Sequence, residues 1–455
     1  MQECPTAFHV VDYCKTKFQA SGFHELPARE SWAGKIQPGG KYWTTRNGSA
    51  IIAFTVGRAY KPGNGVGMIA GHIDANTAKL KPASTKPINE AGCIQLGVAP
   101  YSQGFNQTWW DRDLGIGGRV AVCDPDTGKM STRLVKLDWP VAKVATVTAH
   151  LSNPAFVQDG NPETRMAPIV GLTSAYSEAE RKPLGKPGSF VHNQPPELVR
   201  LIAAELGVSC TQIANWDLEL FDFQPAQVFG MRKELITAGR IDDKLCSWAA
   251  LMGLLIARQS EDDGYIKLVS LFDDEEIGSQ LRQGAKGNFL PSTIERTVEA
   301  LATAAGRPFG PSLLGQTYAR SFLIASDVSH AGHPNFLDLY SQGHIPQLNT
   351  GIAIKHDPNG GFSTDSVSAS VLMRVGELTG NKTQMYQARN DVRAGGSIGP
   401  MLSTMMGCRS TDAGLVQLSM HSVRATTGAL DPGLGVLFYR GFLDNWERID
   451  AEYAT

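Results

Sequence analysis

The sequence predicts an α/β fold in which helices flank a mostly parallel β-sheet, and in which a β-rich domain is inserted. Continuous apolar runs that are typical of buried strands alternate along the chain with amphipathic helical segments. The strand-like runs lie at residues 49–57, 65–74, 265–272 and 321–327, and the helical segments at residues 242–259, 292–306 and 367–380. Ligands of such sheets bind outside the carboxyl ends of the strands.

The middle of the chain has a different character, with loops rich in Gly, Pro and Asn. Residues 119–125 and 132–147 read as antiparallel strands, and residues 157–168 as a long loop. We therefore expect three parts along the chain. They are a first part of the main domain at 1–84, an inserted domain at 85–225, and the second part of the main domain at 226–455.

Composition narrows the class of protein. A chain of 455 residues that is 42% hydrophobic and 19% charged is an ordinary globular protein with room for two domains. Its formal net charge of -2 gives no electrostatic reason to expect nucleic acid or an anionic membrane as partner. The start shows no secretory signal pattern, and the most apolar segment, residues 246–257, is too short to span a bilayer. Seven scattered cysteines, never spaced as CxxC, predict reduced thiols in a cytosol-like compartment.

Four adjacent carboxylates, Asp273 to Glu276, directly follow the apolar run at 265–272. Water solvates most acidic runs on protein surfaces, so a solvated loop is one interpretation and a bound cation is the other. Glu275 and Glu276 should point in different directions from a strand end. One of them can then bind a metal ion while the other faces a reacting water molecule.

Other candidate ligands also follow strand-like runs. His72 and Asp74 are two residues apart, so strand alternation aims both at one face, either as a hydrogen-bonded core pair or as a metal ligand with its orienting acid. Asp242 and Asp243 open a helical segment, where Asp also serves as an ordinary N-cap.

The last candidates lie in the second half of the chain. Asp327 closes one apolar run and is followed by His330 and His333, and His421 ends a further strand-like run. Single histidines of this kind are more often core residues than ligands.

Their shared position beyond strand ends favours a metal centre over a set of unrelated polar residues. Two histidines and at least three carboxylates without cysteine suit a pair of ions such as Zn²⁺, Mn²⁺ or Co²⁺. Without cations the cluster would be self-repelling and costly to desolvate. Two ions about 3.5 to 4 Å apart serve hydrolases by polarising a carbonyl and activating water. A free carboxylate then acts as general base. The sequence has no HExxH or phosphate-loop motif.

Seven stretches resemble, in this order, the M18 family of metallo-aminopeptidases, which includes aspartyl and vacuolar aminopeptidases. They are AGHIDANTAKLKP, WWDRDLGIGGR, AGRIDDKLCSW, LFDDEEIGS, SDVSHAGHPNF, GGSIGP and QLSMHSVRATTG. The resemblance covers nearly the whole chain. It implies a zinc exopeptidase-like catalytic domain with two zinc ions per subunit. It also implies that the inserted domain mediates dimerisation and that dimers assemble into a tetrahedral dodecamer.

The resemblance also implies roles for single residues. The implied metal ligands are His72 and Asp327 for one zinc, Glu276 and His421 for the other, and Asp242 as the bridge. Glu275 is implied as general base, and Asp74 as the residue that orients His72. His150, which would otherwise be a surface loop histidine, is implied to reach a neighbouring subunit's active site and stabilise the tetrahedral oxyanion.

Specificity is divided between two branches of the family. Lys355 stands where aspartyl members have a lysine, and a lysine in a closed pocket would pair with an acidic N-terminal side chain. An exposed strand-end lysine is the alternative. His333 also resembles the aspartyl branch. We expect an aminopeptidase that prefers N-terminal Asp or Glu.

Three rival functions stay open. They are a neutral-residue, vacuolar-type aminopeptidase, another hydrolase of similar metal geometry such as a carboxypeptidase or N-deacylase, and a catalytically silent, self-assembling cargo shell. The expected partners are peptides with a free N-terminus and further copies of the chain. The expected location is the cytoplasm, with the vacuole as the alternative.

Overall fold

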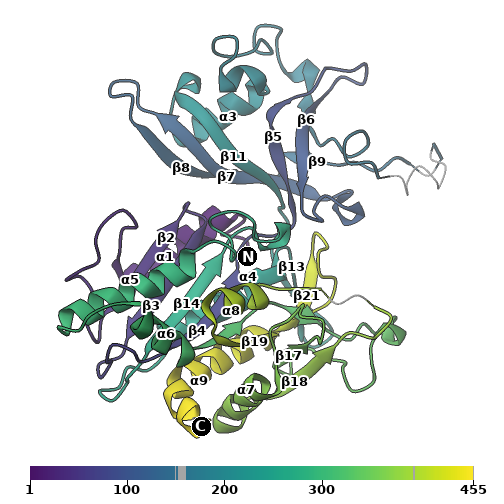
Figure 1. Ribbon diagram of the computed structural model, residues 1–455. Helices are drawn as coiled ribbons and strands as arrows, with labels where there is room; N and C mark the ends of the chain where they lie inside the picture. Colours follow the sequence, from purple (N-terminus) through teal and green to yellow (C-terminus); the bar gives the residue numbers. More distant parts are fainter. Residues whose placement is uncertain (149, 152–159, 393–394, 454–455) are drawn as a thin grey trace.

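The computed structural model describes residues 1–148, 150–151, 160–392 and 395–453. Figure 1 shows two bodies, a larger α/β domain that contains both ends of the described chain and a β-rich domain packed against one side of it. The chain leaves the larger domain after β4 (Val66–His72) and returns to it after β11 (Ile213–Asp222). The site discussed below lies where the two bodies meet.

A nine-stranded mixed sheet forms the centre of the larger domain. Its strands, in spatial order, are β1 (His24–Glu25), β2 (Lys41–Arg46), β3 (Ala50–Val56), β14 (Ile266–Phe272), β4, β15 (Phe322–Ala325), β19 (Arg409–Gly414), β17 (Ile352–His356) and β18 (Thr383–Gln387). The four strands from β14 to β19 are mutually parallel. Antiparallel pairs join β2 to β3, β3 to β14 and β17 to β19, while the outermost pairs β1–β2 and β17–β18 are again parallel, so the sheet is mixed around a parallel centre.

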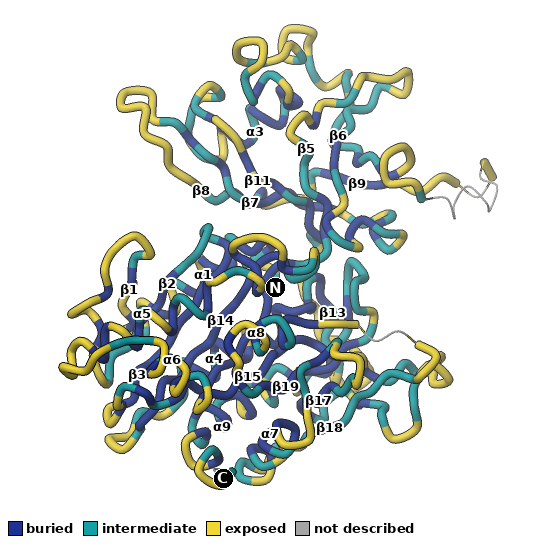
Figure 2. Tube along the Cα trace, viewed as in Figure 1, coloured by how far each residue is buried: buried dark blue, intermediate teal, exposed yellow. Residues whose placement is uncertain are grey.

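Helices cover both faces of this sheet, as the alternation of apolar segments predicted. One face packs against α1 (Ala7–Ala20), α4 (Ile241–Leu255), α7 (Ser366–Thr379) and α9 (Asp431–Glu452), and the other against α5 (Phe289–Ala304), α6 (Pro311–Ala319) and α8 (Gly399–Met406). Neighbouring strand residues divide between the two cores, since Ile69 belongs to the first and Met68 to the second. Figure 2 shows the central strands buried beneath both helical layers.

The second domain is built on a closed six-stranded barrel, a feature that the sequence did not predict. The ring runs β11, β5 (Thr77–Thr85), β6 (Cys93–Tyr101), β10 (Ile169–Leu172), β9 (Ala142–Lys143) and β7 (Asp113–Cys123), and pairing of β7 with β11 closes it. Strand β8 (Met130–Lys136) pairs with the outside edge of β7, and α3 (Pro196–Leu206) packs against the same core. The segment 132–147, expected as one strand, is divided between β8 and β9.

Two short sheets complete the larger domain. Strands β12 (Gln227–Phe229), β13 (Leu235–Ala238) and β21 (Ala425–Gly428) form one, and β16 (Ser329–His330) pairs with β20 (Val416–Gln417) in the other. Part of the loop expected at 157–168, residues 157–159, lies outside the described residues. Among the helices that the structure describes, none has the length and apolarity needed to cross a bilayer.

Candidate metal centre

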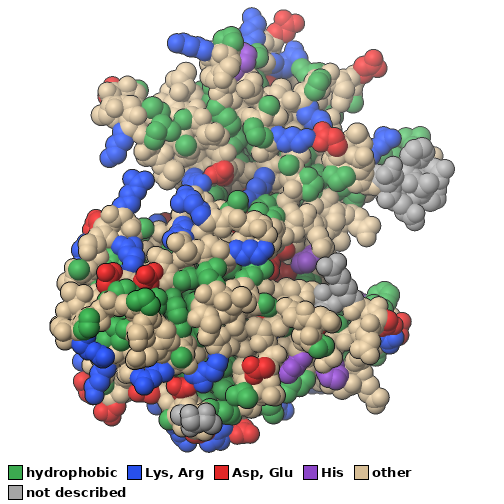
Figure 3. All heavy atoms as spheres, viewed as in Figure 1, with side chains coloured by type: hydrophobic (Ala, Val, Ile, Leu, Met, Phe, Trp, Pro, Cys, Tyr) green, Lys and Arg blue, Asp and Glu red, His purple; other side chains and the backbone are tan. Residues whose placement is uncertain are grey.

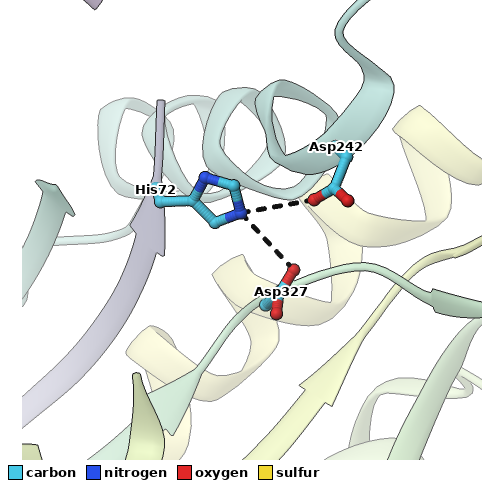
Figure 4. A group of neighbouring side chains, drawn as sticks. All are labelled: His72, Asp242 and Asp327. Carbon is cyan, nitrogen blue, oxygen red and sulfur yellow. Dashed lines mark ion pairs between the residues drawn. The ribbon is translucent and has the colours of Figure 1, made fainter. Parts of the chain in front are cut away.

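The carboxyl ends of three parallel strands meet at the junction with the barrel, and each delivers a candidate ligand. His72 ends β4, Glu275 and Glu276 begin the short helix η5 (Glu275–Ile277) beyond β14, and Asp327 lies two residues after β15. Figure 4 shows His72, Asp242 and Asp327 converging from a strand end, a helix start and a loop. The structure therefore brings together, at the carboxyl ends of the parallel strands, residues that the strand-end argument from sequence had selected.

The first group of ligand-type atoms is centred on the His72 imidazole. Its Nε2 lies 3.2 Å from Asp242 Oδ1 and 3.7 Å from Asp327 Oδ1. One ligand atom from each residue falls within a 4.8 Å cluster. Burial alone would lower the pKa of His72, but its bonds to Asp242, Asp327 and Asp74 outweigh burial and raise that pKa well above the usual value. The surrounding carboxylates thus draw positive charge to this point.

The second group uses the other oxygen of the same aspartate. His421 Nε2 lies 3.5 Å from Asp242 Oδ2 and 3.6 Å from Glu276 Oε2. These three residues also offer ligand atoms within 4.8 Å of one another. The two groups therefore share Asp242, whose Oδ1 faces one histidine and whose Oδ2 faces the other.

Asp74 contacts the His72 ring on the side away from Asp242 and Asp327. Its Oδ1 lies 3.2 Å from His72 Nδ1, which leaves Nε2 turned toward Asp242 and Asp327. The backbone N–H groups of Glu275 and Glu276 donate to the two oxygens of Asp74, each at 3.2 Å. One carboxylate therefore fixes both the imidazole and the acidic turn after β14.

Tyr101, at the end of barrel strand β6, supports Asp74 in turn. Its hydroxyl lies 2.9 Å from Asp74 Oδ2 and 3.1 Å from Asp274 Oδ1. Asp273 and Asp274 are only 7% and 2% exposed. The acidic run is therefore not a solvated loop. Nothing in the sequence near Tyr101 signals this role, because its partners are 27 and 173 residues away.

Asp243 is a second supporting residue that the sequence did not assign. Its carboxylate accepts hydrogen bonds from the backbone N–H of His72 at 3.4 Å and of Val328 at 3.1 Å, and Ser247 Oγ lies 3.4 Å away. It thereby ties the backbones beside two candidate ligands, His72 and Asp327, to the start of α4. The adjacent pair Asp242 and Asp243 was a visible signal, but helix capping explained it equally well from sequence.

The donor set fits divalent cations. Glu276 has a side chain only 3% exposed, and among the described residues no donor partners its Oε1. Burial first, and then repulsion by Asp242, raises the pKa of Glu276 well above its usual range. Burial and the carboxylates of Asp327, Asp74 and Asp242 likewise raise the pKa of Glu275 to about 8. Bound cations would relieve this repulsion and satisfy the free oxygen, and histidine with carboxylate oxygen is a donor set typical of zinc.

Lys355, on β17, is buried, so the exposed strand-end alternative is wrong. Its Nζ donates to Val328 O at 3.1 Å and lies 3.5 Å from Asp327 Oδ2. Burial would lower its pKa, yet the charges of Asp327 and Asp412 raise it, so the ammonium form is held beside a candidate metal ligand.

The two remaining predicted histidines do not join this cluster within the described chain. His333 Nδ1 accepts from the backbone N–H of Asn335 at 3.3 Å, and its ring lies 4.8 Å from that of Phe336. His150 is exposed in the connection between β9 and β10, with Nδ1 3.4 Å from Thr148 Oγ1. Of the stretch 149–154 that carried its resemblance, residues 149 and 152–154 lie outside the described residues.

A recess between barrel and larger domain leads to the second group. It is lined by Asp242, Glu276 and His421 on one side and by Trp109 and the end of β11 on the other. On the face shown in Figure 3, acidic and histidine side chains gather at this junction. The two groups offer ligand atoms for metal ions beside a further carboxylate, Glu275, whose Oε2 lies 3.9 Å from His72 Nε2.

Comparisons with known proteins agree with this geometry. The family model described as aminopeptidase I zinc metalloprotease (M18) matches residues 1–443. Vacuolar aminopeptidase 1 of Saccharomyces cerevisiae is 36% identical, with 99% of this chain and 87% of that protein covered. Aspartyl aminopeptidase of Aspergillus oryzae is also 36% identical, with 97% and 93% covered.

Solved structures give the same result. The structure of Chaetomium thermophilum mApe1 is 58% identical with a TM-score of 0.92, covering 100% of this chain and 97% of that one. The structure of the Saccharomyces cerevisiae mApe1 dodecamer is 35% identical with a TM-score of 0.86, covering 100% and 96%.

Proposed function

The chain belongs to the M18 family of zinc metallo-aminopeptidases, and we propose that it removes N-terminal residues from peptides with two zinc ions held by a shared Asp242. The observation that carries the proposal is the Asp242 carboxylate, because its two oxygens face His72 and His421 separately. A carboxylate in this position bridges paired ions in hydrolases.

The ligand assignment follows the two groups of atoms. His72 and Asp327 would hold the first ion, Glu276 and His421 the second, and Asp242 both. When bound there, zinc would polarise the scissile carbonyl and lower the pKa of the attacking water. Mn²⁺ or Co²⁺ can supply the same chemistry in place of zinc.

Glu275 is the proposed general base. Its backbone N–H is anchored on Asp74, and its carboxylate reaches the edge of the first group without belonging to either candidate ligand set. Glu275 would take a proton from the attacking water and pass it to the leaving amine, so the proton returns to the product.

For specificity we propose acidic N-termini, with Lys355 as the selecting cation and His333 beside the substrate path. The buried ammonium group of Lys355 beside Asp327 supports this proposal. A bound metal ion would balance the negative charge of Asp327, so Lys355 would be left to pair with a substrate carboxylate. Relatives named aspartyl aminopeptidase support it too. A neutral-residue preference is the second candidate, favoured by the 58% identity with Chaetomium thermophilum mApe1 and by the vacuolar relative.

A substrate series tests these functions together. Zinc-supplemented protein would be assayed on Asp-, Glu- and Leu-aminoacyl fluorogenic substrates and on peptides blocked at the amino terminus. Faster cleavage of acidic substrates supports the proposal, and faster cleavage of the leucine substrate supports the neutral alternative. Cleavage of blocked peptides would indicate a different hydrolase, and metal-loaded protein inert on every peptide would indicate a silent assembly.

We also propose that the chain assembles as a tetrahedral dodecamer built from six dimers, in line with the dodecameric Saccharomyces cerevisiae relative. The barrel would mediate dimerisation, and His150 would act in a neighbouring subunit. Light scattering should give about twelve times the mass of one chain. Mixing two inactive variants, His150→Ala and Glu275→Gln, should restore activity, because each lacks a group that the other supplies across the interface.

The proposed location is the cytoplasm, with the vacuole as the alternative suggested by the vacuolar relative. Fractionation of the source cells with vacuolar and cytosolic marker enzymes distinguishes the two.

A further inference from the structure

A single barrel segment, residues 101–108, contacts the supports of both candidate metal sites. Tyr101 reaches Asp74 behind His72, as described above. The following residues reach the loop 418–424, which carries His421 between the short strands β20 and β21. The barrel is therefore in direct contact with the larger domain's ligand loops.

The His421 loop has an unfavourable backbone conformation. Ser419 and His421 have φ values of 63° and 64°, in the left-handed region that side chains other than glycine rarely adopt. Such conformations persist only where surrounding contacts hold them. Within the larger domain, Leu418 and Thr426 exchange backbone hydrogen bonds of 2.8 and 3.1 Å, and the backbone N–H of Ser422 donates to Ser419 O at 3.1 Å.

Further contacts to this loop come from the barrel. Asn106 Nδ2 donates to His421 O at 2.9 Å, and the backbone N–H of Val423 donates to Thr108 Oγ1 at 2.9 Å. Asn106 Oδ1 in turn accepts from Thr108, so these two residues form one unit. The loop backbone is thus held at the candidate ligand and two residues after it by residues more than 300 positions away in the chain.

An ion pair extends this attachment past the loop. Arg424 Nη1 lies 2.6 Å from Oδ2 of Asp222, the last residue of β11. Arg112, which directly precedes β7, donates from Nη2 to Oδ1 of the same aspartate at 2.8 Å. Asp222 is buried, so its two arginine partners balance its charge. The loop is therefore attached to the barrel from His421 to its C-terminal end at Arg424.

Gln103 fixes the imidazole itself. Its Oε1 lies 3.2 Å from Nδ1 of His421, while Nε2 of the same imidazole faces Asp242 and Glu276. An amide oxygen accepts from Nδ1–H, which selects the tautomer whose Nε2 lone pair is free for a metal. This is the role that a carboxylate or carbonyl usually plays behind a metal-binding histidine.

We propose that Gln103, Asn106 and Thr108 are positioning residues, and that the second metal site is completed by the inserted barrel. This inference rests on the proposed two-ion centre. It means that the larger domain supplies the ligands of the second ion, while the barrel supplies the loop geometry and histidine tautomer that make them competent. Among the described residues, Tyr101 is the barrel residue that bonds Asp74 behind the first group.

The test measures zinc binding by the full-length chain, without reference to activity. Metal content would be determined over a series of buffered free zinc concentrations for wild type, Gln103→Met, Gln103→Glu and Thr108→Val. Met keeps the length of Gln but cannot accept from Nδ1–H, whereas Glu keeps an acceptor. Gln95→Met is the matched control, because Gln95 lies on β6, the strand that ends two residues before Gln103, and its side chain bonds only Asn89 and Ala167 among the described residues.

The expected result is two zinc ions in wild type and in Gln95→Met. In Gln103→Met the tighter ion should be retained while the affinity for the other falls about 10- to 100-fold, as is usual when a histidine's supporting partner is removed. Gln103→Glu should restore the affinity for this second ion, and Thr108→Val should weaken the binding of the same ion. His421→Ala provides the reference for loss of the second site.

Two results would overturn the inference: unchanged binding in both Gln103→Met and Thr108→Val, or equal weakening of both ions in Gln103→Met. A wild-type chain that binds only one ion would instead overturn the two-ion proposal. Urea unfolding of each chelator-treated variant shows whether it folds, and a Gln103→Met midpoint matching that of Gln95→Met confines the effect to metal binding.

Discussion

Replacing Asp74 by Asn should separate the orientation of His72 from the binding of metal by its neighbours. Asp74 accepts four hydrogen bonds in the structure, from His72 Nδ1, Tyr101 and the backbone N–H groups of Glu275 and Glu276. An Asn side chain has only one acceptor oxygen. The substitution therefore forces a choice between its partners.

The contacts indicate how the Asn side chain would turn. If its oxygen stays on the Oδ1 side, His72 and Glu275 keep their acceptor, and the amide can donate to the Tyr101 oxygen, whose proton then goes to Asp274. Only the N–H of Glu276 loses its partner, at a cost of about 1–3 kcal/mol. The fold should survive, while His72 exchanges a charged acceptor for a neutral one.

The measured quantities are zinc affinity and kcat/KM. We expect the first ion to bind about 10- to 100-fold more weakly and kcat/KM to fall in parallel at limiting zinc. Asp274→Asn is the matched control, because Asp274 bonds the same Tyr101 hydroxyl without contacting His72. Equal zinc affinity in Asp74→Asn, Asp274→Asn and wild type would refute the orientation of His72 by Asp74.

Three further predictions follow from the site. Glu275→Gln should keep both ions yet lower kcat about 10²- to 10⁴-fold; near-normal turnover would remove Glu275 from the mechanism. Lys355→Met should abolish an acidic preference while cleavage of Leu substrates persists, and equal losses on Asp and Leu substrates would point instead to its contact with Asp327. Because the folded-state pKa of Glu275 is raised to about 8, its stabilising contribution is complete only in acid and is lost as pH rises toward 8. The urea midpoint of chelator-treated protein should therefore decrease as the pH rises from 5.5 to 8, and it should decrease less in Glu275→Gln. The difference between the urea midpoints with and without zinc should widen over the same range. A difference that does not widen would contradict the charge argument.

Local patterns were enough to predict the layered part of the fold. The apolar runs at 49–57 and 65–74 became β3 and β4, because a strand buried on both faces is apolar throughout. The helical segments likewise became α4, α5 and α7. The barrel was missed because its closure depends on β7 pairing with β11, about 100 residues apart, and no local pattern specifies such a register.

The candidate site divides in the same way. Residues that offer ligand atoms can be recognised in the sequence by their type and by their position beyond a strand end, as for His72 and Asp327. Residues that support them are ordinary in sequence, and Tyr101 and Gln103 gain their roles only from partners 27 to 318 positions away. Supporting contacts of this kind become visible only once the two domains are packed together.

The most direct test of the two-ion centre is the number of zinc ions bound per chain by wild type and by Asp242→Ala. Equilibrium dialysis against buffered zinc, followed by elemental analysis, gives this number directly. Because Asp242 faces both histidines, we expect two ions in wild type and weakened binding of both in the variant. One ion in wild type, or the loss of a single ion in Asp242→Ala with the other bound as tightly as before, would contradict a shared bridging carboxylate.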